Sequence, residues 1–354
     1  MRTAQWTLGI FLAATLFLGG LQISSLRGEA AQDPASPVKG TLAPVFRPPP
    51  IERLRLRLLD PPGPLVDLDV DGPRIAVLAR TGWALDSGNG FPEWHGEETA
   101  GSPTWLSPAE SIALAGEVVF ILEPQRSILS IWDTAGARLQ EISIPVRRDL
   151  AQRATRVVLG PSNRPVVVLQ GMNRDGTAYW EILELNRRGD VTGLVSLPTD
   201  DEKAIYREPQ LAVHGPALLA MSTLSQELWA VDLERGQLHP IAQRRSPPLW
   251  PLPRAERRKH ARVLSRMPSA MAAHAQLPDY WPTLREFTVQ MDGTILQATA
   301  AGEEIVQLEQ LSLLLDPLGR ANLEGFSQPV FLARGRAFVA YEGVEETRVH
   351  EIIF

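Results

Sequence analysis

Six segments of the chain share one form, in which an apolar-rich strand, a tight turn and a second apolar strand follow one another. Five of the six turns contain Gly, which supplies the positive φ that a two-residue hairpin turn requires. This repeat constrains the fold strongly, because each unit buries its apolar face only by stacking on its neighbours. The segments span residues 65–79, 110–122, 155–169, 209–221, 286–299 and 328–341.

A second hairpin follows the first in four of these units. Asp or Asn ends a strand, where its side chain can bond the turn backbone, and a Gly closes the turn. The pairs are Asp133 with Gly136, Asn186 with Gly189, Asp232 with Gly236 and Asp316 with Gly319. Two hairpins in succession make a four-stranded antiparallel unit. Such units at a period of about 40 to 50 residues predict an all-β chain folded as a β-propeller.

The number of blades follows from the two ends of the repeat. Residues 328–354 have room for three strands and lack a fourth. Residues 54–59, "LRLRLL", alternate apolar and basic side chains as an exposed strand does. We expect this N-terminal strand to complete the last blade, which removes the open sheet edges that a β-protein must avoid. The prediction is a six-bladed propeller.

The hairpins and the stretch "MDGTILQA" (291–298) carry a resemblance to a known group. Residues 51–354 resemble the six-bladed β-propellers of bacterial exported proteins, the loose group that includes NHL-like and TolB-like domains. The resemblance implies a fold and leaves the activity open, since such propellers include binding scaffolds, lactonases and lyases.

The N-terminal region has the pattern of an export signal. One basic residue precedes an apolar run and then several small residues, which predicts a signal peptide over residues 1–30. An N-terminal membrane anchor is the alternative, because the run is nearly long enough to span a bilayer. Residues 31–50 are rich in Pro and predict an extended linker, followed by a propeller domain over 51–354. We therefore expect an extracytoplasmic protein, periplasmic or secreted. The chain has no Cys, so it has no disulfide and no thiolate metal ligand.

One segment breaks the repeat. Residues 244–277 contain apolar side chains at helical spacing, which predicts a helical insertion near 252–276. Within 244–266, eight basic residues face one acidic residue. This segment is either a basic surface for an anionic membrane or an acidic partner, or a solvated helix lying over a blade edge. The whole chain has a net charge of −6, which argues against binding nucleic acid.

The sequence contains none of the common catalytic or nucleotide-binding motifs, and no two of its six His residues show metal-ligand spacing. We therefore predict no cofactor. Loops carry function more often than strands, so the connections between blades are the first place to seek a ligand site. Aromatic and charged side chains there suit a ligand, although Tyr280 and Trp281 would also serve by packing against the insertion. The candidate ligand-binding residues are Arg147, Arg148, Asp200, Asp201, Tyr206, Asp279, Tyr280 and Trp281.

The stretch "DLDVDG" (67–72) begins like a calcium-binding loop. A twelve-residue loop starting at Asp67 needs an acidic ligand where Leu78 stands, and the shorter nine-residue form needs one where Ile75 stands. The turn is therefore better explained as a hairpin turn. Asp67 and Asp69 point to the same side of an innermost strand, toward the central channel, where buried carboxylates must be wet, paired or metal-bound. They are the one candidate pair of metal ligands.

Two hypotheses for function result. The first is a monomeric, non-catalytic binding or scaffold module for a protein, peptide or glycan. The second is a metal-dependent hydrolase or lyase, lactonase-like, with its site in the central channel.

Overall fold

The computed structural model describes most of the chain after residue 50. The described residues are 51–86, 92–96, 108–147, 149, 151–173, 177–197, 208–244, 250–251, 258, 261–262, 265, 280–281, 284–300, 306–323, 329–343 and 345–353. Together they belong to one compact unit, Ala43–Phe354. The predicted signal peptide (1–30) and linker (31–50) lie outside these ranges.

Five four-stranded antiparallel sheets follow one another along the chain, and in each the strands pair in sequence order. The first two sheets contain β2 (Leu65–Asp71), β3 (Arg74–Ala79), β4 (Trp83–Asp86) and β5 (Trp94–His95), then β6 (Ser111–Ala115), β7 (Val118–Glu123), β8 (Ile128–Asp133) and β9 (Arg138–Ser143). The next two contain β10 (Arg153–Leu159), β11 (Pro165–Met172), β12 (Ala178–Leu185) and β13 (Val191–Ser196), then β14 (Pro209–His214), β15 (Ala217–Ser222), β16 (Glu227–Asp232) and β17 (Gln237–Gln243). The fifth contains β20 (Leu284–Val289), β21 (Ile295–Ala300), β22 (Val306–Leu311) and β23 (Pro317–Leu323).

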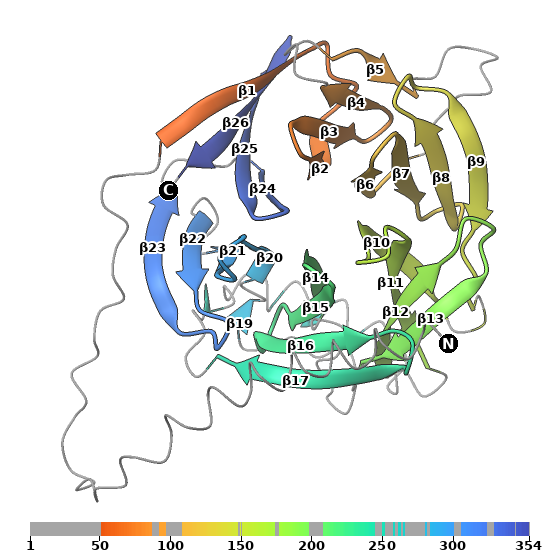
Figure 1. The fold of residues 1–354 in the computed structure, drawn as a ribbon, viewed down its shortest axis with the longest axis vertical. Coiled ribbons are helices and arrows are strands. Elements are labelled where there is room, and N and C mark those ends of the chain that lie inside the picture. Colours follow the sequence, from red (N-terminus) through yellow and green to blue (C-terminus); the bar gives the residue numbers. More distant parts are fainter. Residues whose placement is uncertain are drawn as a thin grey trace, which may run out of the picture. The chain divides into compact units, whose positions relative to one another are not determined.

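The sixth sheet combines strands from both ends of the described chain. It has the order β1-β26-β25-β24, with β24 (Val330–Ala333), β25 (Arg336–Glu342), β26 (Glu346–Ile353) and the N-terminal β1 (Ile51–Leu59). Strand β1 pairs antiparallel with β26, so that Ile51 lies opposite Ile353 and Leu59 lies opposite Glu346. The sheets surround a centre formed by β2, β6, β10, β14, β20 and β24 (Figure 1). The described chain is an all-β, six-bladed β-propeller, as the hairpin repeat predicts.

The apolar core is divided among the junctions between blades. The described residues form six clusters of buried side chains, and each cluster joins two neighbouring blades. At the first junction Trp83 and Trp132 are both fully buried, with ring centroids 6.0 Å apart. Because each strand places alternate side chains on opposite faces, one blade contributes to the cluster before it and the cluster after it. The innermost strands therefore keep fixed positions around the channel.

The innermost strand of each blade turns into the second strand through the predicted hairpin. In the first blade Asp71 pairs with Arg74 across the turn, and Gly72 has φ +61°. That conformation is strained for most residues and open to Gly. The structure thus confirms that "DLDVDG" is a strand followed by a turn.

The inserted segment is described at only a few positions. Strands β18 (Trp250–Pro251) and β19 (Tyr280–Trp281) form a two-stranded sheet, and residues 258 and 261–262 have helical backbone. Most of the helix predicted near 252–276 lies outside the described residues. Among the residues that are described, no helix is long and apolar enough to cross a membrane.

One basic residue of the 244–266 segment is not on the surface. The Arg244 side chain is 5% exposed and forms two hydrogen bonds with Glu309, at 2.7 and 3.0 Å. Arg320 and Gln297 also donate to the Glu309 carboxylate, which is 1% exposed. Burial raises the pKa of Glu309, but the hydrogen bond and charge of Arg244, with the other donors, bring it below its usual range. Arg244 therefore ties the end of the fourth blade to the fifth and is not part of a basic surface.

Candidate functional site

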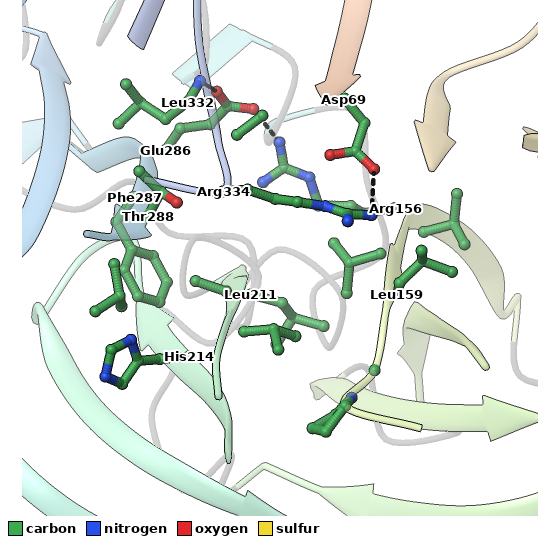
Figure 2. Close-up of a pocket in the computed structure, with 18 of the residues that line it drawn as sticks. Asp69, Arg156, Leu159, Leu211, His214, Glu286, Phe287, Thr288, Leu332 and Arg334 are labelled. Atoms are coloured by element: carbon green, nitrogen blue, oxygen red, sulfur yellow. Dashed lines mark hydrogen bonds and ion pairs between the residues drawn. The ribbon is translucent and has the colours of Figure 1, made fainter. Parts of the chain in front are cut away.

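A cavity of about 370 Å³ lies in the central channel. Most of its wall comes from β10, β14 and β20 and from the hairpin turns that follow them, with smaller parts from β2, β6 and β24. Turn residues Asn163, His214, Met291 and Arg334 all contribute to the lining. The cavity therefore extends from the middle of the channel to the face that carries these turns. We call it the turn-side cavity (Figure 2).

The wall of the turn-side cavity is about half apolar and half polar. Leu159, Leu211, Val213, Phe287 and Val289 all line it. They occupy the innermost strands, where apolar side chains are required because the strands pack against neighbouring blades. At the rim, the Met291 side chain is fully exposed to solvent, with a relative accessibility of 102%. A rim of this kind offers a ligand apolar contact at the entrance.

Five charged side chains gather at the channel end of the cavity. They are Asp67 and Asp69 of β2, Arg156 of β10, Glu286 of β20 and Arg334, which follows β24. We call them the central charged cluster. Arg156 reaches across the channel to an ion pair with Glu286, and Arg334 approaches Asp69 at 3.5 Å (Figure 2). Four different blades thus contribute charge to one site.

The aspartates of β2 join the first blade to the second. Side chains two residues apart point to the same side of a strand, so Asp67, Asp69 and Asp71 all face β6. Each accepts a backbone N–H from that strand or from the turn after it, at 2.8–2.9 Å; the donors are Ile112, Leu114 and Gly116. We call this set of bonds the aspartate ladder. It explains the spacing of the three aspartates without a metal ion.

Other innermost strands use the same type of bond. Ser111 of β6 accepts the N–H of Val157 at 3.2 Å. Glu286 accepts the N–H of Leu332 at 2.6 Å, and Thr288 accepts that of Gly335 at 2.7 Å. Backbone N–H groups on innermost strands have no further strand to pair with, so a polar side chain of the preceding blade satisfies them. A polar residue at these positions therefore has a structural role in addition to any role in binding.

The pKa values of the cluster reflect its burial. Burial raises the pKa of Asp69 to about 6, although Arg334 and two backbone N–H groups lower it. Burial raises the pKa of Glu286 to about 7, against the charge of Arg156. The pKa of Asp67 is raised in the same way, with Arg156 again opposing the shift. Near neutral pH this cluster therefore binds protons that the unfolded chain would release.

This proton binding predicts an unusual dependence of stability on pH. Between about pH 4 and pH 7 the folded cluster holds protons that the unfolded carboxyls lose, so the free energy of unfolding falls as pH rises. We expect Glu286→Gln to flatten this decline by about 3 kcal/mol, since one pKa unit corresponds to about 1.4 kcal/mol. The measurement is urea unfolding of both proteins at several pH values.

The difference between the two proteins is the quantity to compare, because other groups also titrate. Burial lowers the pKa of His95, which makes its contribution to stability decrease as pH falls and so opposes the trend. Arg57 lowers the pKa of Glu346 to about 2, and that contribution is lost only below about pH 4.5. Equal pH dependence in wild type and Glu286→Gln would contradict the raised pKa of Glu286.

The candidate ligand residues from the blade connections are described only in part. The Arg147 side chain bonds Glu181 at 2.7 Å and stacks on Tyr179, and it does not line the turn-side cavity. This ion pair runs from one blade to the next, as Arg244 and Glu309 do. The backbone of Tyr280 and Trp281 forms β19. The remaining candidates, Arg148, Asp200, Asp201, Tyr206 and Asp279, lie outside the described residues.

Sequence reasoning placed Asp67 and Asp69 correctly on an innermost strand but missed Arg156, Glu286 and Arg334. A signal was present: "TRVVL" and "EFTVQ" each place a charged residue beside apolar residues of an innermost strand. The partner of each could not be identified, since Arg156 and Glu286 are 130 residues apart. In the part of the chain that the structure describes, no group of three or more His, Asp or Glu residues is placed to hold a metal ion.

Comparison with known proteins supports the fold. No family model matches the sequence, and no curated protein matches it either. Among solved structures, a calcium-binding protein, regucalcin, from Agrobacterium tumefaciens is 13% identical, with a TM-score of 0.51 over 88% of this chain and 97% of that one. A member of the DUF4221 family from Bacteroides vulgatus is 10% identical, with a TM-score of 0.52 over 86% and 97%. The likeness is one of fold. At such identities it establishes a shared propeller architecture and carries no residue roles.

Proposed function

We propose that this protein is a non-catalytic, extracytoplasmic binding module whose ligand occupies the turn-side cavity. The ring holds six innermost strands at fixed positions, and the turns that follow β10, β14, β20 and β24 border a cavity with both apolar and polar walls and a charged end. Ligand sites in propellers and barrels commonly lie at such channel mouths. The extracytoplasmic location rests on the signal-like N-terminal sequence.

One observation carries the non-catalytic part of the proposal. Each carboxylate of the central charged cluster already accepts a backbone N–H that links two blades. A general base or a nucleophile must be able to approach the reacting atoms of its substrate. Moving any of these carboxylates would break a bond between blades. We therefore infer that the main role of these carboxylates is to join neighbouring blades, and that contact with a ligand is an additional role.

A hydrolase or lyase is the second candidate, and Glu286 is the residue that favours it. A carboxyl with a pKa of about 7 in a cavity has the acidity of a general acid or base at neutral pH. A calcium ion, as in the regucalcin name, would need several oxygen ligands at 2.3–2.6 Å. At Asp67 and Asp69 such an ion would displace N–H donors and approach Arg334 and Arg156.

Thermal melting in EDTA and then in excess Ca²⁺, Mg²⁺, Mn²⁺ or Zn²⁺ tests this assignment. We expect the melting temperature to change by less than about 1 °C, because an ion that does not bind the folded state cannot stabilise it. Asp69→Asn serves as the control variant, since it removes one of the candidate ligand carboxylates. A rise of several degrees with one ion, lost in Asp69→Asn, would favour the metal-dependent enzyme instead.

A further inference from the structure

The central charged cluster has one more acidic group than basic groups. Its three carboxyl groups, on Asp67, Asp69 and Glu286, face two guanidinium groups, on Arg156 and Arg334, which leaves −1 when all are ionised. The Arg156 and Glu286 side chains are only 18% and 13% exposed, so solvent screens this charge weakly. One further cation at the cluster would balance it.

The carboxylates also have room for another donor. An ionised carboxylate accepts about four hydrogen bonds. Among the described residues, Glu286 accepts one from Arg156 and one from Leu332. Asp69 accepts from Val70 and Leu114 and pairs more loosely with Arg334. A monovalent donor can therefore bind here without displacing the bonds that join the blades, which a divalent metal ion could not do.

The shape of the turn-side cavity suits one kind of cation. Apolar side chains, among them Leu159, Leu211 and Val213, lie between the rim and the charged end. Lysine and arginine have this same division, with an aliphatic stem that packs on apolar surface and a charged head at its tip. A stem along the wall would bring the head to Glu286. A metal ion or a small inorganic cation would leave the apolar wall unused.

We propose that the turn-side cavity binds a lysine or arginine side chain of a peptide or protein ligand, with its aliphatic stem on the apolar wall and its charged head at the central charged cluster. This inference rests on the proposed binding function and specifies its ligand. The residues flanking the side chain would contact the rim, where Met291 offers an exposed apolar contact and Asn163 and His214 offer polar ones. The net charge of −6 favours approach of a basic partner.

Four peptides test the proposal by calorimetry on the exported protein: Ac-Gly-Gly-Xaa-Gly-Gly-amide with Xaa as lysine, arginine, norleucine or glutamate. We expect the lysine or arginine peptide to bind about tenfold more tightly than the norleucine peptide, because a charged head adds an ion pair in a weakly solvated site. Butylamine, which has the stem and head without the flanking residues, should bind more weakly than the lysine peptide.

Two variants separate electrostatics from misfolding. Glu286→Gln should weaken binding of the lysine peptide about tenfold, whereas Arg156→Gln should strengthen it by removing a competing cation. A merely misfolded variant would not bind more tightly. Glu117→Gln, which lies outside the cavity with a side chain that is 80% exposed, is the matched control.

Affinity for the lysine peptide should also fall between about pH 8 and pH 5.5, as the carboxyls take up protons. The groups facing Glu286 and its site are Asp67 and Asp69 of β2, Arg156 of β10, His214 of the β14 turn and Arg334 of the β24 turn. Asp67 and Asp69 remain in Glu286→Gln, so the fall should be shallower in this variant but still present.

Three results would overturn the inference. Equal binding of the norleucine and lysine peptides would show an apolar site, and tighter binding of the glutamate peptide would show an anion site; either leaves the binding function standing. Absence of binding by all four peptides would reject a peptide side chain as the ligand. The proposed non-catalytic function is tested separately, by the melting experiment with metal ions, and stabilisation by one ion there would contradict it.

Discussion

Replacing Glu309 with Ala should lower the free energy of unfolding by about 3 to 5 kcal/mol, because it leaves the buried charge of Arg244 without its anion. Among the described residues, the Arg244 guanidinium would retain its hydrogen bond to the Gln226 side chain, at 3.0 Å. In a chain of this size the loss corresponds to a fall of roughly 6 °C or more in melting temperature. Urea unfolding followed by tryptophan fluorescence measures it directly.

Two controls accompany that experiment. Glu117→Ala removes an exposed partner of Arg74 and should cost less than about 1 kcal/mol. The double substitution of Arg244→Met with Glu309→Leu should recover only part of the loss: apolar residues of similar volume often replace a buried ion pair without penalty, but Gln297 and Arg320 would still lack their acceptor. If Glu309→Ala and Glu117→Ala cost the same, the buried pair is not what joins the fourth and fifth blades.

Replacing Asp67 with Ala should cost about 3 kcal/mol, because the change leaves buried donors unsatisfied. The Asp67 carboxylate accepts hydrogen bonds from Ser111 Oγ at 2.7 Å and from the N–H groups of Leu68 and Ile112, both at 2.9 Å. Its loss also removes a negative neighbour of Arg156. Thermal and urea unfolding are the measurements.

The aspartate ladder supplies its own controls. Asp71 accepts the equivalent bond from Gly116, but its side chain is 30% exposed, so Asp71→Ala should cost about 1 kcal/mol or less. Asp67→Asn keeps an acceptor while removing the charge and should cost less than Asp67→Ala. An equal loss in Asp67→Asn and Asp67→Ala would mean that charge, and not hydrogen bonding, is the contribution of Asp67.

The fold could be predicted from the sequence because each hairpin is specified by residues that lie close together in the chain. A hairpin needs only two adjacent strands and a turn with Gly or Asp, and all of these occur within about 15 residues of one another. The pairing of β1 with β26 could be expected for a different reason, since the last blade has room for only three strands of its own. The turn at Asp71 and Gly72 followed from comparison with the other five.

Of the candidate site, only the two aspartates of β2 could be predicted from the sequence. Alternation along β2 shows that Asp67 and Asp69 face the same side, but it does not show what they face. Their partners are backbone N–H groups about 45 residues away, and every strand carries such groups. The pairing of Arg156 with Glu286 depends on the diameter of the channel, which no local pattern encodes. Arg244 was expected on a surface because its partner, Glu309, could not be identified from the sequence. The two residues are 65 positions apart in the chain.

The most direct test of the proposed ligand is a crystal structure of the protein with the lysine peptide bound. The account predicts electron density in the turn-side cavity, with the lysine ammonium within hydrogen-bonding distance of the Glu286 carboxylate and its stem against Leu159 and Leu211. Density on the opposite face, beside Arg147 and the blade connections, would contradict it. So would a metal ion held by Asp67 and Asp69.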